Sequence, residues 1–284
     1  MKVIDVLLAI DESFPFAHAF DGDKVGLLVG DAGAEVCGIL VSLDPGLDAI
    51  ARAQTIGANL IVSHHPIRFN SRGHYNISHV ADTYPERILA QALSAKIAII
   101  AAHTNVDVSS VARNYWGDKL SFQSLGPLPA FEAEFGIPCT KNELSASDPY
   151  GEMWQIPTPR SLSQLAAEVA GITECAVKVY GDPETLIASV ATATGSGSGR
   201  IAEALVAGVD CIISGEFSYH AALAAVESGL TLIEIGHDIS ELPLVDMIAD
   251  AIKVRTPIKD EEIHIDDRPQ LWHSITSSGK VVED

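Results

Sequence analysis

The chain has 284 residues, of which 47% are hydrophobic and 20% are charged, so it is long enough to bury one large core or two smaller ones. Its 38 acidic residues against 18 basic ones give a formal net charge of −20, and such a surface repels a phosphate backbone, so nucleic-acid binding is not expected. The sequence contains no run of about 18 apolar residues, so a membrane span is not predicted. With no C-x-x-C pair and too short an apolar start for a signal peptide, we expect a cytoplasmic protein.

The first half of the chain alternates short apolar runs with helical periodicity. This alternation predicts a mainly parallel sheet covered by helices. In chain order, the expected elements are a strand over 37–43, a helix over 47–56, a strand over 58–62, a helix over 80–93 and a strand over 97–102.

The second half repeats this plan. Its expected elements are strands over 187–194, 209–213 and 231–235, and helices over 201–207, 219–227 and 240–252. The proline-rich segment 126–160 is interpreted as strands and connections between the halves. The sequence therefore predicts an α/β protein of two similar halves, residues 1–125 and 126–284, each with a mainly parallel sheet flanked by helices.

Side chains that bind metals follow three of the predicted strands. The carboxyl ends of parallel strands are where α/β proteins bind ligands. The residues at these ends are His64, His65, Asp107, His237 and Glu241. Three imidazoles with two carboxylates suit Zn, Fe, Mn, Co or Ni better than calcium. We therefore expect two divalent ions per chain, with Glu241 or Asp107 as the carboxylate that both share.

Each of these segments also has an interpretation without metal. Adjacent side chains on a strand point to opposite faces. His64 and His65 can therefore share one cluster only if the chain leaves strand geometry at this point. The alternative is that each histidine binds a different ion. HTNVD is typical of a helix start with Asp107 as the cap, and GHDISE of one capped by Asp238 or Ser240. Three such segments at three strand ends favour the metal site.

Two further segments of the second half are weaker candidates. Gly195, Ser196 and Gly197 lie between a predicted strand and a helix, where backbone N–H groups can bind phosphate, although a tight turn explains the same residues. Glu216 and His220 follow another strand. They are candidates for orienting ligands or moving protons, with helix capping as the alternative.

The ordered motifs resemble one known family. SHHP, HTNVD, the Gly-Ser-Gly turn, GEFSYHAA and GHDISE resemble the Ngg-interacting-factor-three-like family of dinuclear metal-centre proteins, whose members are often called GTP cyclohydrolase type two homologues. FDGDKVGLLVG resembles the family's Trp-Asp-Asn-x-Gly-Leu signature, with Phe20 in place of Trp and Gly22 in place of Asn. The resemblance implies a metal pair in the cleft between two α/β halves, ring-shaped hexamers, the five strand-end residues as ligands, and His103 as a residue that supports them.

A pair of divalent ions favours hydrolysis by metal-activated water. The expected substrate is a phosphoester, or a nucleotide ring as the cyclohydrolase name suggests, with His103, Glu216 or His220 assisting proton transfer. The alternative is a protein that stores or delivers metal, or that binds other proteins, without turnover. An enzyme keeps an open coordination position, whereas a structural or storage site is closed by protein ligands.

Overall fold

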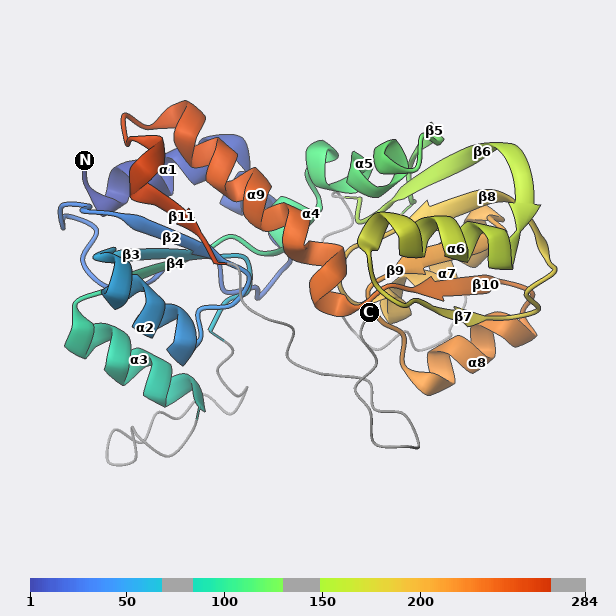
Figure 1. Cartoon of the computed structure of the whole chain (residues 1–284), viewed down its shortest axis with the longest axis horizontal. Coiled ribbons are helices and arrows are strands. Elements are labelled where there is room, and N and C mark those ends of the chain that lie inside the picture. Colours follow the sequence, from blue (N-terminus) through green and yellow to red (C-terminus); the bar gives the residue numbers. More distant parts are fainter. Residues whose placement is uncertain (68–83, 130–148, 267–284) are drawn as a thin grey trace. The chain divides into compact units, whose positions relative to one another are not determined.

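Figure 1 shows a computed structural model of the chain, which describes residues 1–67, 84–129 and 149–266. These residues form two compact units, each with its own sheet and helices. Among the described residues, the first unit comprises 1–67, 84–115, 129, 149–151 and 241–266, and the second comprises 116–128 and 152–240. Within the described ranges, no helix has the length and apolar character needed to cross a membrane.

The first unit contains a five-stranded sheet in the order β1-β4-β3-β2-β11. β2, β3 and β4 are parallel neighbours, β11 adds a parallel strand beside β2, and β1 pairs antiparallel with β4. The strands of this unit are β1 (Gly26–Val29), β2 (Ile39–Ser42), β3 (Leu60–Ser63), β4 (Ala98–Ala101) and β11 (Ile263–Ile265). Its helices are α1 (Val3–Ser13), η1 (Phe16–His18), α2 (Leu47–Ile56), α3 (Tyr84–Ala95), α4 (Thr104–Asp107), η4 (Asp260–Glu262), and parts of α5 (Ser110–Lys119) and α9 (His237–Arg255).

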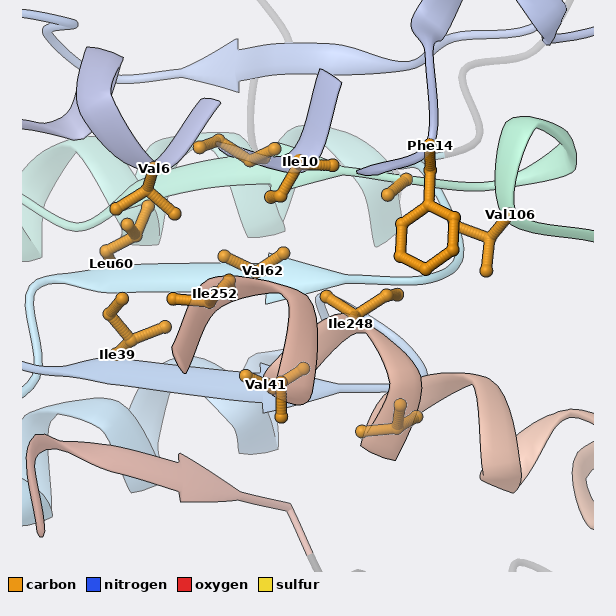
Figure 2. Close-up of a cluster of buried hydrophobic side chains, with 14 of the residues drawn as sticks. Val6, Ile10, Phe14, Ile39, Val41, Leu60, Val62, Val106, Ile248 and Ile252 are labelled. Carbon is orange, nitrogen blue, oxygen red and sulfur yellow. The ribbon is translucent and has the colours of Figure 1, made fainter. Parts of the chain in front are cut away.

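Helices cover both faces of this sheet, so its central strands are apolar at every position except the last residue of β2 and of β3, which is serine. α2 and α3 pack on one face, where Leu40 and Ile61 point. α1 and α9 pack on the other face, onto which the neighbouring residues Val41 and Val62 project, as Figure 2 shows. This second cluster also contains Ile248 of α9.

The second unit contains a six-stranded sheet in the order β5-β6-β8-β9-β10-β7. Its strands are β5 (Gln123–Pro127), β6 (Glu152–Ser161), β7 (Lys178–Tyr180), β8 (Leu186–Thr192), β9 (Cys211–Ser214) and β10 (Thr231–Glu234). Its helices are α6 (Leu162–Thr173), η3 (Gly197–Arg200), α7 (Ile201–Ala207), α8 (Tyr219–Glu227) and the remaining parts of α5 and α9. Side chains of α7 and α8 form its core with Ala191, Ile212 and Leu232 of the sheet.

The two units share a β-α-β-α-β core of three parallel strands, β2-β3-β4 in one and β8-β9-β10 in the other. This confirms the prediction of an α/β protein with two sheets flanked by helices. The second sheet is not mainly parallel, however, because β5, β6 and β7 all pair antiparallel with their neighbours. The expected strands within 126–160 are observed as β5 and β6, and residues 130–148 lie outside the described part, as do 80–83 of the expected helix 80–93.

The boundaries of the two compact units do not coincide with the predicted division between residues 125 and 126. From Glu241 onward, α9 belongs to the first unit, and β11 completes that unit's sheet. The physical reason is burial, since Leu244, Ile248 and Ile252 of α9 are almost fully buried in the same cluster as α1. The C-terminal part of the described chain therefore returns to the first unit.

Candidate metal centre

Three neighbouring parallel strands of the first unit end in polar residues. β2 is followed by Asp44, β3 by His64 and His65, and β4 by His103. Because β2, β3 and β4 pair side by side in register, these residues meet at one edge of the sheet. Asp107 follows one helical turn after His103, as the last residue of α4.

His64 and His65 lie in one cluster although they are adjacent in the chain. β3 ends at Ser63, directly before them. The centroids of their two rings are 5.1 Å apart, so the side chains do not point to opposite faces. The chain therefore leaves strand geometry at this point, which is one of the two arrangements that the sequence left open.

Both rings are held through their Nδ1 atoms. Nδ1 of His64 lies 3.0 Å from the carbonyl oxygen of Ala102, and Nδ1 of His65 lies 2.8 Å from Oδ1 of Asp44. Since a carbonyl oxygen only accepts, Nδ1 of His64 is the donor, which leaves Nε2 as the nitrogen whose lone pair can bind a metal. A histidine whose second nitrogen donates to an oxygen in this way is typical of metal ligands.

The Nε2 atom of His64 faces two buried carboxylates. It lies 3.6 Å from Oδ2 of Asp107 and 3.8 Å from Oε1 of Glu241, both beyond hydrogen-bonding distance. This nitrogen is buried and has no hydrogen-bond partner. A lone pair that faces two carboxylate oxygens away from water is unfavourable unless a cation lies between them. The three side chains therefore fit a divalent ion.

The second oxygen of Glu241 faces the other histidine. Oε2 of Glu241 lies 2.8 Å from Nε2 of His65. Burial lowers the pKa of His65, but the hydrogen bonds and charges of Asp44 and Glu241 outweigh it and raise this pKa to about 10. In the metal-free protein His65 is therefore a cation held between two carboxylates, and a bound ion takes over the role of its proton.

His103 stands beside these ligands and is oriented by Asp23. Its Nδ1 lies 2.9 Å from both carboxylate oxygens of Asp23. Oδ2 of Asp23 also accepts from the backbone N–H and the hydroxyl of Thr104, at 3.2 and 2.6 Å. Burial raises the pKa of Asp23, but the hydrogen bonds from His103 and Thr104 outweigh it and hold the pKa well below its usual range. The ring centroid of His103 is 5.2 Å from that of His64.

The first unit thus assembles two overlapping groups of metal-binding side chains. One contains His64, Asp107 and Glu241, and the other contains His64, His65 and His103. In each group the candidate ligand atoms lie within 4.8 Å of one another. The ring centroid of His103, which was expected to support the ligands, is 5.2 Å from that of His64 and 5.7 Å from that of His65.

His237 belongs to the second unit, where it begins α9 one helical turn before Glu241. Residues four apart on a helix lie on the same face. Nδ1 of His237 is 3.1 Å from Oε1 of Glu216, so Glu216 contacts a candidate ligand. α9 begins at His237, so a helix does start in the GHDISE segment, but Asp238 and Ser240 lie inside this helix and do not cap it. Asp107 is likewise not the cap of the helix at HTNVD, because α4 has His103 as its N-cap and Asp107 as its last residue.

The remaining candidates lie in the second unit. The amide N–H of Gly195 donates to Oγ of Ser240 at 2.8 Å, and that of Gly197 donates to the carbonyl of Glu216 at 3.0 Å. These two donors are therefore already used within the protein. His220 is exposed on the first turn of α8, its ring centroid 5.3 Å from that of Tyr219, and it belongs to no candidate group in the described chain.

Sequence reasoning missed three residues that contact the candidate ligands. Asp44 stands two residues after the end of β2, as His65 stands two residues after the end of β3, so the same strand-end rule could have found it. Asp23 lies in an irregular segment before β1, and Tyr150, whose hydroxyl is 3.5 Å from Oδ1 of Asp107, lies before β6. Asp23 lies within the FDGDKVGLLVG segment, whose resemblance to a family signature marked the segment but not this residue. No local pattern distinguishes Tyr150.

Comparisons with known proteins agree with this architecture. Residues 1–268 match the model of the Duf34/NIF3 (NGG1p interacting factor 3) family. A relative from Clostridium acetobutylicum named "GTP cyclohydrolase 1 type 2 homolog" is 30% identical, with 94% of this chain and 97% of that protein covered. Among solved structures, a Staphylococcus aureus hypothetical protein aligns with a TM-score of 0.79 and 23% identity, covering 97% of this chain and 99% of that one. A Bacillus cereus protein related to NIF3 gives 0.75 and 20%, covering 95% and 97%. Because a single family model spans nearly the whole chain, this protein belongs to the Duf34/NIF3 (NGG1p interacting factor 3) family.

Proposed function

We propose that this protein binds two divalent metal ions and hydrolyses a nucleotide or another phosphoester. The observation that supports this proposal most directly is the orientation of Glu241, whose Oε1 faces His64 and whose Oε2 faces His65. A carboxylate that presents one oxygen to each of two histidines is suited to bridge two ions. In this proposal His64 and Asp107 hold the first ion with Glu241. His65 would hold the second with the same carboxylate, and His237, one helical turn before Glu241 on α9, is the remaining proposed ligand.

The donor set supports ions of the first transition series or zinc. Three imidazoles with two carboxylates combine borderline and hard ligands, which suits Zn, Fe, Mn, Co or Ni. Each of His64, His65 and His103 contacts an oxygen through Nδ1, so Nε2 is the nitrogen through which each would bind an ion.

Divalent ions held by these residues would activate a water molecule and polarise a substrate oxygen. The chain's own contribution to turnover is His103, which Asp23 orients and which stands beside the ligands. In phosphoester hydrolysis, the oxygen of water bonds to phosphorus, the ester P–O bond breaks, and the proton of water reaches the leaving oxygen. His103 is placed to carry that proton. This Asp–His pair favours turnover over metal storage, and the name of the Clostridium relative favours a nucleotide as substrate.

Elemental analysis of protein purified without chelator or affinity metal tests the metal centre. We expect about two transition-metal ions per chain, as the bridging role of Glu241 requires. Glu241→Gln keeps the shape but removes the shared charge, so it should lower the occupancy of both ions. Glu227→Gln, on the exposed face of α8, is the matched control. Two ions retained in Glu241→Gln would exclude the bridge, and no metal after reloading with Zn, Mn or Fe would exclude the centre.

Turnover is tested on the reloaded protein with nucleotides and simple phosphoesters. His103→Ala should abolish most hydrolysis, because His103 is placed to carry the proton. Since the proposed ligand set does not include His103, both ions should stay bound, and loss of an ion would make His103 a ligand instead. Wild-type protein that holds two ions and hydrolyses none of these compounds would contradict the hydrolase and favour storage or delivery of metal.

A further inference from the structure

The turn formed by residues 195–198 is bound into the protein on both sides. Its backbone pairs with the segment after β9: the N–H of Glu216 donates to the carbonyl of Gly195 at 3.1 Å, and the N–H of Gly197 donates to the carbonyl of Glu216 at 3.0 Å. The hydroxyl of Ser214 also donates to the carbonyl of Gly195, at 3.2 Å. The N–H of Ser218 donates to the hydroxyl of Ser198 at 2.9 Å. The turn therefore extends the pairing of β8 with β9 beyond the strands.

Ser240 connects this turn to the first turn of α9. Its buried hydroxyl accepts from the N–H of Gly195 at 2.8 Å and donates to the carbonyl of His237 at 2.7 Å. Its own carbonyl accepts from the indole N–H of Trp116 at 3.1 Å. The backbone of His237 is thus held through one hydroxyl that has both of its hydrogen-bonding roles occupied.

The packing around this contact leaves no room for a larger residue. A Cβ atom on Gly215 would lie 2.5 Å from the carbonyl oxygen of Gly195, 2.6 Å from the hydroxyl of Ser240 and 2.8 Å from the Cα atom of His237. Contacts this short are excluded for real side chains. The turn, the segment after β9 and the start of α9 therefore approach as bare backbone, which requires glycine at position 215.

The side chain of His237 is held from the same segment. Oε1 of Glu216 lies 3.1 Å from Nδ1 of His237. The position of Glu216 is itself set by its two backbone hydrogen bonds to the turn, and the next residue, Phe217, donates its N–H to the buried carboxylate of Glu234 at 3.2 Å. With Nδ1 facing a carboxylate, Nε2 of His237 is the nitrogen available to a metal.

We propose that the turn 195–198 is a positioning element for His237, acting on its backbone through Ser240 and on its ring through Glu216. The inference rests on the proposed function in one respect, which is that His237 is a metal ligand. It assigns the glycine-serine segment a role in metal affinity, and it makes Ser240 and Glu216 positioning residues.

The test is a double-mutant cycle on zinc affinity, measured with the full chain by competition against a chromophoric chelator. Residues that orient a metal ligand typically contribute about 10- to 100-fold to metal affinity, so Ser240→Ala and Glu216→Ala should each weaken zinc binding by that factor. In a His237→Ala background neither change should weaken binding further, because the group they position is gone. A residue with a merely structural role would weaken binding equally in both backgrounds.

Ser189→Ala is the matched control, since Ser189 also uses its hydroxyl twice, with Asp210, in the same sheet. It should leave zinc affinity unchanged. If Ser240→Ala fails to fold, Glu216→Ala carries the test alone, because the Glu216 side chain is 55% exposed.

The outcomes separate the two proposals. Unchanged zinc affinity in His237→Ala would overturn the proposed ligand set. A weakened His237→Ala with unchanged Ser240→Ala and Glu216→Ala would overturn only the positioning role. Equal losses for Ser240→Ala and Glu216→Ala with and without His237 would also overturn it, because the turn would then act on the protein as a whole.

Discussion

Replacing Asp23 by Asn perturbs the best-satisfied carboxylate of the candidate metal centre. Asp23 accepts from three donors, the ring Nδ1–H of His103 and the N–H and hydroxyl of Thr104. Asparagine has almost the same shape but one acceptor oxygen, and its NH₂ group would face a donor. Both Thr104 donors lie on Oδ2, so the asparagine oxygen takes that place and its NH₂ group replaces Oδ1, 2.9 Å from the Nδ1–H of His103. Two donors then face each other in a largely buried place, where the Asp23 side chain is 10% exposed.

An unsatisfied buried donor costs about 1–3 kcal/mol, so we expect Asp23→Asn to lower the free energy of unfolding by about this amount. The pKa of Asp23 lies below its usual 3.8 in the folded protein. A lowered folded-state pKa stabilises the protein above the unfolded-state pKa, and this stabilisation is lost as the pH falls. The difference between wild type and variant should therefore be largest near neutral pH and shrink as the pH falls below about 4.

Urea unfolding of the metal-free proteins at several pH values measures this difference. Asp21→Asn, two residues earlier on an exposed side chain, is the control and should match the wild type. Equal stability of Asp23→Asn and wild type at neutral pH would refute the reasoning, because the hydrogen bonds to His103 and Thr104 would then contribute nothing.

Three other predictions concern packing and titration. Gly117→Ala in α5 should lower the free energy of unfolding by about 1–3 kcal/mol, since a Cβ atom there would lie 2.1 Å from the Trp154 ring. Gly171→Ala in α6 is the control, because a Cβ atom there would have no atom within 4 Å. It should leave the protein equally or more stable in chemical unfolding. Because the pKa of His65 is raised from 6.5 to about 10, the stability that His65 contributes to the metal-free protein should be fully present at pH 6.5 and be lost as the pH rises to about 10. Thermal unfolding between pH 6.5 and pH 10 measures this, and a flat profile over that range would contradict it. Burial raises the pKa of Cys211 to about 12, so this thiol should react with a maleimide only after unfolding, and mass spectrometry of labelled native protein checks it.

The sequence by itself predicts the parts of this protein that depend on local patterns. Apolar runs such as ILVS and LIVS indicated strands buried on both faces, and the structure has them as β2 and β3. Polar residues directly after such runs were expected at one sheet edge, and His64 and His65 are found there with Asp107 close by. These inferences succeed because strand period and strand direction place the following residue without reference to the rest of the chain.

Only the tertiary structure decided which distant segments meet. The apolar face of α9 packs with α1, so Glu241 belongs to the first unit although it follows the second in sequence. Asp23 reaches His103 across 80 residues, and the antiparallel pairing of β7 with β10 leaves no trace in either strand's own composition. Such contacts form because they bury apolar surface or satisfy a polar group, and both depend on partners that no local pattern specifies.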